Sequence, residues 1–214
     1  MAEHRQKMTY ALDQNPLNIY PDAWLEHTPK AIASDSELFE ELWKLWDVIP
    51  YTPNPMNKKT NINRKQATFG ASYSFGAQKS FKVDIPEAQW PNIVSKVLED
   101  VKRLSGSEKY KIVHVNWYPD GAAGLAPHSD NDSQMVPGMS IYSYTFLSEP
   151  GNPRGFQVYD KTNSKQLHDL QLDDGDLVVM SGEMQRGFTH GVKKSAAKRF
   201  KNLKRINLTV RAWS

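Results

Sequence analysis

The chain has 214 residues, a net charge of +3 and no cysteine. The lack of cysteine excludes disulfides, thiolate zinc sites and a cysteine nucleophile, and no apolar stretch in the sequence is long enough to cross a membrane. The first residues are polar and lack the apolar core of a secretion signal. We therefore expect one soluble, intracellular domain, in the cytoplasm or nucleus, that acts as a monomer and has no membrane partner.

Two amphipathic helices are predicted in the first half of the chain. The first spans about Ser36 to Trp46, and Ser34 and Glu37 have the spacing of a capping box at its start. The second spans about Pro91 to Leu104 and ends in a Ser-Gly-Ser sequence. Each helix has an apolar stripe that must pack against another element. A short strand is expected ahead of them, within residues 17–25.

Residues 64–76, between the two helices, are predicted to form a strand and a turn. Their aromatic residues Phe69, Tyr73 and Phe75 follow Arg64 and a second basic residue. Aromatic rings interleaved with cations are typical of proteins that stack nucleobases and hold their phosphates. Aromatic strand residues more often form a core, so both interpretations stay open at this point.

The second half of the chain contains short strands separated by Gly, Pro, Asn and Asp residues. The predicted strands are Ile112–Tyr118, Ser140–Leu147, Gly155–Asp160, Gln166–Leu172, Asp176–Ser181 and Arg205–Ala212. Many short strands without intervening helices indicate a sandwich or jelly roll. We expect a single domain with a mainly β fold and flanking helices. In it, a jelly roll (a double-stranded β-helix) over residues 111–214 is buttressed on one face by the helices of residues 1–110.

His128 and Asp130 lie one residue apart in the segment 126–132. If that segment is extended, both side chains point to the same side and can bind one metal ion. With a second imidazole, expected from His190, they would form a facial triad that leaves three positions of the metal open. A surface turn is the simpler interpretation of an isolated His-x-Asp pair, but the rest of the chain favours the metal site. The other histidines have simpler expected places: His4, His27 and His168 at the surface or in loops, and His114 in the core.

Two predicted strands have one polar face each, where a jelly roll places its interior or its mouth. These faces consist of His114, Asn116 and Tyr118 in one strand and of Arg205, Asn207, Thr209 and Arg211 in the other. Arg205 and Arg211 would be about 20 Å apart along an extended strand, and side chains that lean together leave a gap suited to a short dicarboxylate. Guanidinium groups bind carboxylates bidentately. A solvated face is the alternative for each strand.

The positive charge is concentrated near the C-terminus. From Gln185 to the end the sequence has no Asp or Glu. The same stretch carries Arg186, Lys193, Lys194, Lys198, Arg199, Lys201, Lys204, Arg205 and Arg211. A cluster of this kind attracts phosphates through counterion release. For the part between Lys193 and Lys204, a solubilising loop is an equally good interpretation.

Together these motifs resemble the AlkB family of Fe(II)- and 2-oxoglutarate-dependent dioxygenases, which dealkylate nucleic-acid bases. The resemblance rests on Asn116-x-Tyr118-x-x-Gly121, His128-x-Asp130-x-Asp132, His190 and Arg205-x-Asn207-Leu208-Thr209-x-Arg211. The His-x-Asp…His part occurs in many oxygenases, whereas the closing arginine motif, in the right order after it, is far more specific. The resemblance covers about Arg64 to the C-terminus, and residues 62–80 are similar to the nucleotide-recognition lid of the DNA-repair homologues.

The resemblance implies a role for each matching residue. The iron ligands would be His128, Asp130 and His190, and these three with Arg211 would be the catalytic residues. The residues that hold 2-oxoglutarate would be Asn116, Tyr118, Arg205, Asn207 and Arg211. The residues that contact the substrate would be Arg64, Tyr73, Phe75 and Asp132.

The resemblance implies an enzyme that binds Fe(II) and consumes 2-oxoglutarate and O2. It would demethylate bases of the 1-methyladenine or 3-methylcytosine type in DNA or RNA and release formaldehyde, succinate and CO2. The target base must leave the stack to reach the metal. One alternative is a 2-oxoglutarate oxygenase that acts on a protein or a small molecule, with a basic stretch that only solubilises. Another is a jelly-roll binding module without iron. Salt-sensitive oligonucleotide binding separates the first alternative from the nucleic-acid enzyme.

Overall fold

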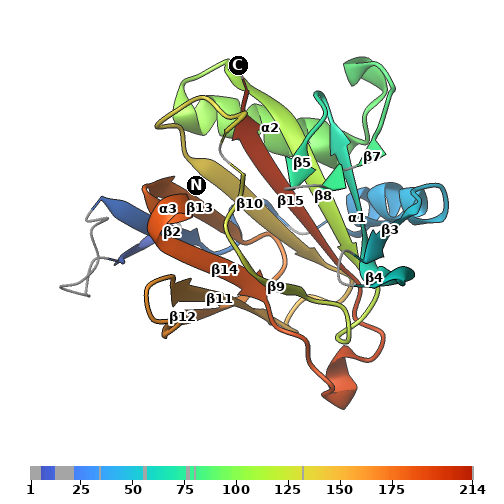
Figure 1. Cartoon of the computed structure of the whole chain (residues 1–214). Helices are drawn as coiled ribbons and strands as arrows, with labels where there is room; N and C mark the ends of the chain where they lie inside the picture. Colours follow the sequence, from blue (N-terminus) through green and yellow to red (C-terminus); the bar gives the residue numbers. More distant parts are fainter. Residues whose placement is uncertain are drawn as a thin grey trace.

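Two β-sheets face each other, and two helices cover the outer side of the larger sheet (Figure 1). This computed structural model describes residues 6–12, 22–33, 35–54, 57–75, 78–79, 81–131 and 133–213. The larger sheet contains β1 (Met8–Ala11), β2 (Ala23–Thr28), β3 (Tyr51–Asn54), β4 (Asn57–Phe69), β7 (Phe81–Lys82), β8 (Tyr110–Tyr118), β10 (Ile141–Leu147), β13 (Leu177–Gly182) and β15 (Arg205–Ala212). The smaller sheet contains β9 (Leu125–His128), β11 (Arg154–Asp160), β12 (Gln166–Leu172) and β14 (Phe188–Val192). A separate pair is formed by β5 (Ser74–Phe75) and β6 (Gln78–Lys79).

The strand order links segments that are far apart in the sequence. In the larger sheet the order is β1-β2-β13-β10-β15-β8-β4-β3, with β7 beside β4, and in the smaller sheet it is β12-β11-β14-β9. The pairs on both paths are antiparallel, and β7 pairs with β4 in parallel. This arrangement confirms the predicted mainly β jelly roll, and β1 to β4 extend its larger sheet.

The first helix, α1 (Ser36–Trp43), is capped by Asp35. The Asp35 carboxylate accepts hydrogen bonds of 3.0 and 3.2 Å from two backbone N–H groups of the first turn. The prediction that Ser34 caps this helix was therefore wrong, and Ser34 itself lies outside the described residues. An Asp carboxylate accepts these bonds as well as a Ser hydroxyl does, so spacing alone cannot choose between adjacent residues of the two types.

The second helix, α2 (Asn92–Ser105), begins one residue after Pro91, which the sequence had placed in the first turn. It ends at Gly106, whose φ of 63° lies in the left-handed region that glycine adopts without strain. The remaining short helices are η1 (Lys44–Asp47), η2 (Glu87–Gln89), α3 (Met184–Gly187) and η3 (Lys198–Phe200). Because η1 continues α1 as a 3-10 helix, the predicted end at Trp46 falls within it.

The main core lies between the helices and the outer face of the larger sheet. Alternate residues of β8 and β15, among them Trp117 and Leu208, are fully buried against α1 and α2. The indole nitrogen of Trp117 donates a 3.2 Å hydrogen bond to the carbonyl of Leu42 in α1. Since side chains alternate along a strand, the polar residues of β8 and β15 point the opposite way, toward the smaller sheet.

The predicted strands in the second half of the chain are all present, but β9 and β14 were not predicted. Both are short and contain Pro or Gly, which weakens a strand pattern. The expected strand within residues 17–25 begins only at Ala23, and residues 13–21 lie outside the described residues. The prediction of a surface His27 was wrong: β2 pairs with β13, so His27 is buried with its Nε2 2.9 Å from Oδ2 of Asp176.

Candidate active site

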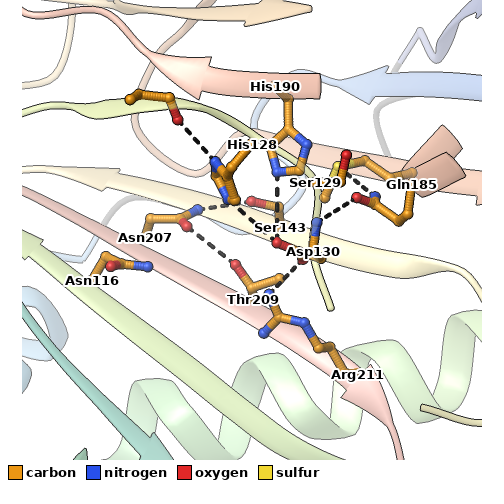
Figure 2. A network of polar contacts seen from close by, with 12 residues as sticks. Asn116, His128, Ser129, Asp130, Ser143, Gln185, His190, Asn207, Thr209 and Arg211 are labelled. Atoms are coloured by element: carbon orange, nitrogen blue, oxygen red, sulfur yellow. Dashed lines mark hydrogen bonds and ion pairs between the residues drawn. The ribbon is translucent and has the colours of Figure 1, made fainter. Parts of the chain in front are cut away.

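Strand register brings two imidazoles together. In the smaller sheet, His190 of β14 is paired opposite His128 of β9, and their ring centres are 4.5 Å apart. The next residue, Gly191, allows this close approach, because a Cβ atom there would lie 2.6 Å from the carbonyl oxygen of Leu125 in β9. Two histidines that stand 62 positions apart in the sequence, by the difference of their numbers, therefore share one side of the site (Figure 2).

Asp130 completes the cluster from the loop that follows β9. Its Oδ1 atom lies 3.4 Å from Nε2 of His128 and 3.8 Å from Nε2 of His190. One potential ligand atom from each of the three residues lies within 4.8 Å of the other two. The backbone N–H of Asp130 donates a 2.8 Å hydrogen bond to Oε1 of Gln185, which fixes the loop beneath the carboxylate (Figure 2).

Each of the two rings directs its Nε2 atom toward Asp130. The Nδ1 atom of His128 is 3.0 Å from the carbonyl oxygen of Ala126. A carbonyl only accepts, so Nδ1 carries a proton, and Nε2 is the nitrogen of this ring that faces the cluster. Burial, together with the nearby His128, lowers the pKa of His190 to about 3, so this ring is neutral at physiological pH.

The third member of the cluster is held ionised by an arginine. Burial alone would raise the pKa of the Asp130 carboxyl group, but Arg211 and the two histidines hold that pKa well below its usual value. The Nη2 atom of Arg211 donates a 2.5 Å hydrogen bond to Oδ2 of Asp130. The cluster thus offers two imidazoles and one carboxylate, which is the donor set that non-haem Fe(II) takes in a facial arrangement.

The strand β15 presents buried cations next to this cluster. Arg205 is 1% exposed, and its Nη2 atom donates a 3.0 Å hydrogen bond to Oγ1 of Thr145. Its Nε and Nη1 atoms, like those of Arg211, are buried and meet no hydrogen-bond acceptor among the residues that the structure describes. Burial lowers the pKa of Arg205, and Tyr118, whose ring centre is 5.0 Å from Cζ, partly offsets this. Buried donors without partners are costly, so a carboxylate ligand fits here.

Two asparagines continue the polar wall. The side-chain nitrogen of Asn207 donates hydrogen bonds of 2.8 Å to Oγ of Ser143 and to the carbonyl of Tyr144. The side-chain oxygen of Asn116 accepts a 3.0 Å hydrogen bond from Nε of Arg64 in β4. Arg64 therefore reaches the site through Asn116, from the strand next to β8.

Most of these groups line one cavity between the sheets. Its lining includes the three residues of the cluster and Asn116, Tyr118, Arg205, Asn207 and Arg211, so the structure brings together the residues predicted to hold iron and 2-oxoglutarate. Tyr73 is not in this lining but is fully buried against Arg211. Asp132 and the side chain of Phe75 lie outside what the structure describes.

Three polar residues at the site were not predicted. Ser143 lines the cavity, Thr145 binds Arg205, and Gln185 fixes the Asp130 backbone. The alternation of the predicted strand 140–147 places Ser143 and Thr145 on one face and was a usable signal. Nothing in the local sequence distinguishes Gln185, whose partner lies 55 residues away.

Beyond the cavity, a buried arginine fixes the segment 193–204, which we call the basic segment. Arg154 is 2% exposed and donates hydrogen bonds to the carbonyls of Asp120, Ala123 and Lys193 at 3.0, 2.8 and 2.9 Å. The exposed cations of the basic segment are Lys193, Lys194, Lys198, Arg199 and Lys201. Within the described part of the chain none of these five pairs with a carboxylate, so their charges are available to a partner.

Comparisons with known proteins identify the family. Residues 24–211 match the model of a family described as the 2OG-Fe(II) oxygenase superfamily. Curated relatives include the DNA oxidative demethylase ALKBH2 of mouse, 26% identical over 161 residues, of cattle, 27% over 198 residues, and of human, 25% over 197 residues. These matches cover 71%, 84% and 84% of this chain. They cover 62%, 64% and 69% of the relatives, so the chain spans less than two thirds of the mouse and bovine proteins.

A solved structure also matches. The structure of OsALKBH1 superimposes with a TM-score of 0.56 and 17% identity over 88% of this chain and 96% of that chain. At this identity the match supports the fold alone. Taken with the family match and the ALKBH2 relatives, it confirms the predicted resemblance to the AlkB family. In the described residues, no helix has the length and apolar character needed to cross a membrane.

Proposed function

We propose that this chain, which belongs to the 2OG-Fe(II) oxygenase superfamily, is an Fe(II)- and 2-oxoglutarate-dependent dioxygenase that demethylates N-alkylated bases in DNA or RNA. The observation that carries the proposal is the cluster of His128, Asp130 and His190 beside the unpaired donors of Arg205 and Arg211. The substrate class is supported by the ALKBH2 relatives, which are DNA oxidative demethylases by name. Bases of the 1-methyladenine or 3-methylcytosine type are the expected targets.

The cluster would hold the metal, and each residue has a defined task. His128 and His190 would offer a nitrogen lone pair each, and Asp130 would offer Oδ1 while Arg211 occupies its Oδ2. Fe(II), when bound there, supplies the activation of O2 that is coupled to oxidation of the keto acid. The protein would contribute the arrangement of these three ligands, which would leave the other positions of the metal to the keto acid and O2.

The two arginines would set the direction of 2-oxoglutarate. Arg211 contacts the carboxylate of the cluster and is therefore the arginine at the metal end of the cavity. Arg205 stands six positions earlier on β15, with Thr145 and Tyr118 around its guanidinium. A diacid that bound both would present the carboxylate next to its keto group to the metal end and the distal carboxylate to Arg205, whose fork binds it bidentately.

The overall reaction balances as a hydroxylation followed by loss of formaldehyde. One oxygen atom of O2 enters the N-methyl group and the other enters succinate, while 2-oxoglutarate loses CO2. The C–N bond of the hydroxymethyl group then breaks, formaldehyde leaves, and the ring nitrogen recovers its lone pair or a proton. An alkylated base pairs poorly and is cheaper to extrude from a stack, which favours damaged over normal bases.

The basic segment supports a nucleic-acid substrate. It follows β14 in the chain after His190, and Arg154 anchors it through the carbonyl of Lys193. Its exposed cations would contact phosphates of the strand that carries the target base. Each phosphate contact releases counterions, so binding should weaken steeply as salt is added.

The test is an assay with the protein loaded anaerobically with Fe(II) and then given 2-oxoglutarate, O2 and an oligonucleotide with one 1-methyladenine or 3-methylcytosine. We expect stoichiometric formaldehyde and succinate, and restoration of the normal base by mass spectrometry. The same oligonucleotide without the methyl group is the control and should yield no formaldehyde. Succinate formation that no methylated oligonucleotide stimulates, together with salt-insensitive oligonucleotide binding, would instead support an oxygenase for a protein or small molecule.

A further inference from the structure

The ring of Tyr73 packs against the arginine that holds the carboxylate of the cluster. Tyr73 is fully buried, and Cζ of Arg211 lies 4.4 Å from the centre of its ring. The guanidinium of Arg211 in turn donates its 2.5 Å hydrogen bond to Oδ2 of Asp130 (Figure 2). Ring, guanidinium and carboxylate thus form one chain of contacts that leads to the potential metal ligand.

The contact between the Tyr73 ring and the Arg211 guanidinium depends on their relative orientation. An aromatic face attracts a guanidinium stacked over it, and the attraction is stronger where water is excluded. Arg211 is 2% exposed, and among the described residues its Nε and Nη1 atoms have no hydrogen-bond partner. The ring of Tyr73 and the carboxylate of Asp130 are therefore the two groups that orient this guanidinium before a ligand binds.

The ring itself is fixed by its surroundings. Its centre is 5.5 Å from the ring of His114 on β8 and 6.1 Å from that of Trp213, which follows β15. His114 is anchored as well, with Nδ1 3.1 Å from Oγ1 of Thr68. Because its neighbours hold the Tyr73 ring on several sides, the ring can fix the position of Arg211 although Tyr73 does not line the cavity.

We propose that Tyr73 is a positioning residue that acts through Arg211 on Asp130. Its ring holds the Arg211 guanidinium in the orientation that donates a hydrogen bond to Oδ2 of Asp130. Oδ1 of Asp130 then stays directed to His128 and His190. The inference rests on the proposed function, because it takes the cluster to be a metal site. It gives Tyr73 a task different from the base contact that the family resemblance implies.

The test measures metal binding to the apoprotein rather than turnover. Co(II) is the probe, since its visible absorption reports both affinity and coordination geometry. Tyr73→Phe keeps the ring and should bind Co(II) within twofold of the unchanged protein. Tyr73→Met fills the space with a flexible chain that lacks an aromatic face, and should weaken Co(II) binding roughly 10- to 100-fold, as loss of a group that orients a ligand does.

Phe69→Met is the matched control. Phe69 is also fully buried, and its ring packs on Trp90 with centres 5.5 Å apart, away from the cluster. It should lower the melting temperature as Tyr73→Met does but leave Co(II) affinity within twofold. If both variants lose affinity equally, Tyr73 is only a core residue and the proposal is overturned.

Two further outcomes separate this inference from the proposed function. An unchanged protein that binds no Co(II) would refute the metal site, and the positioning role with it. Tight binding by the unchanged protein and by Tyr73→Met alike would refute the positioning role alone. If Tyr73→Met does not fold, replacement of Tyr73 by 3,4,5-trifluorophenylalanine keeps the shape and withdraws the ring's negative face. Weaker Co(II) binding than in Tyr73→Phe would support the proposal, and equal binding would overturn it.

Discussion

The cavity and the basic segment are neighbours in the chain but are built in opposite ways. In the cavity, Asp130 and Arg211 are 5% and 2% exposed and bond to each other. In the basic segment, Lys193, Lys194 and Arg199 are exposed, and the structure gives them no acidic partner among its described residues. Under the proposed function, the reaction would depend on fixed, buried geometry, whereas contact with the nucleic acid would depend on exposed charge at the surface. Substitutions in the cavity should therefore impair the reaction and spare nucleic-acid binding, and substitutions in the basic segment should do the reverse.

The largest effect should come from the buried side of the contrast. His128→Ala removes one of the two imidazoles, so we expect no detectable succinate or formaldehyde. The side chain of His128 is 22% exposed and fills no core position, so the melting temperature should change little. An assay of succinate formation checks the loss of turnover, and thermal unfolding of the same sample checks the stability.

His168→Ala is the control for that variant, because His168 lies on β12, outside the cavity lining. It should retain full turnover. Retained turnover in His128→Ala would contradict the metal assignment, whatever the control does.

The second variant tests the cationic wall of the cavity. Arg205→Met should weaken 2-oxoglutarate binding by roughly 30-fold or more, since truncating one partner of a buried charged pair costs about 2–5 kcal/mol. Without 2-oxoglutarate the variant should be as stable as the unchanged protein or about 1 kcal/mol more stable, because a buried cation with unsatisfied donors is replaced by an apolar chain. Calorimetric titration with 2-oxoglutarate and thermal unfolding measure the two effects, and a large loss of stability would argue against this account.

The third variant tests the link between the two regions. Arg154→Met leaves several carbonyls without their donor, including those of Ala123 and Lys193. We expect a loss of about 3 kcal/mol, or a fall in melting temperature of roughly 6–12 °C. Arg186→Met, at an exposed arginine that pairs with Glu183, should cost less than about 0.5 kcal/mol. Equal melting temperatures for both variants would rule out the anchoring role.

The smallest effect should come from the surface. Replacing Lys193, Lys194 and Arg199 together by alanine should weaken single-strand binding on the order of tenfold, and lower the slope of log affinity against log salt by about 2, at about 0.7 per phosphate contact. Succinate formation without nucleic acid should not change. Fluorescence anisotropy over a salt series measures the slope.

An equal change of charge elsewhere is the control for this triple variant. Lys96 and Arg103 are exposed on α2, which covers the outer face of the larger sheet, and Lys165 is exposed ahead of β12. Alanine at these three positions should leave the salt slope nearly unchanged. If both triple variants lower it equally, the basic segment makes no special contact.

The sequence predicted regular strands well and irregular ones poorly. Strands such as Gln166–Leu172 and Arg205–Ala212 were placed at their observed bounds, because alternation and flanking turn residues determine them locally. The strands that carry His128 and His190, β9 and β14, were missed, because each is held in place by its partner rather than by its own pattern.

The chemistry of the site was predictable where it depends on residue type and spacing. The three residues that the structure brings together could be named from His128-x-Asp130 and a distant histidine. The contacts that orient Asp130 could not be predicted, because Arg211, although named as a site residue, and Gln185 meet it across 81 and 55 residues of chain. Contacts of that range depend on the tertiary fold, and local spacing contains no record of them.

Gly191 shows that an inactivating change need not touch any functional group. A methyl group added at this position would act as a wedge 2.6 Å from the Leu125 carbonyl and would force β9 and β14 apart. The imidazoles of His128 and His190 would separate although both remained chemically intact. The single hydrogen atom on the α-carbon of Gly191 is in this sense part of the proposed metal site, and a screen for inactive variants with intact ligands should recover position 191.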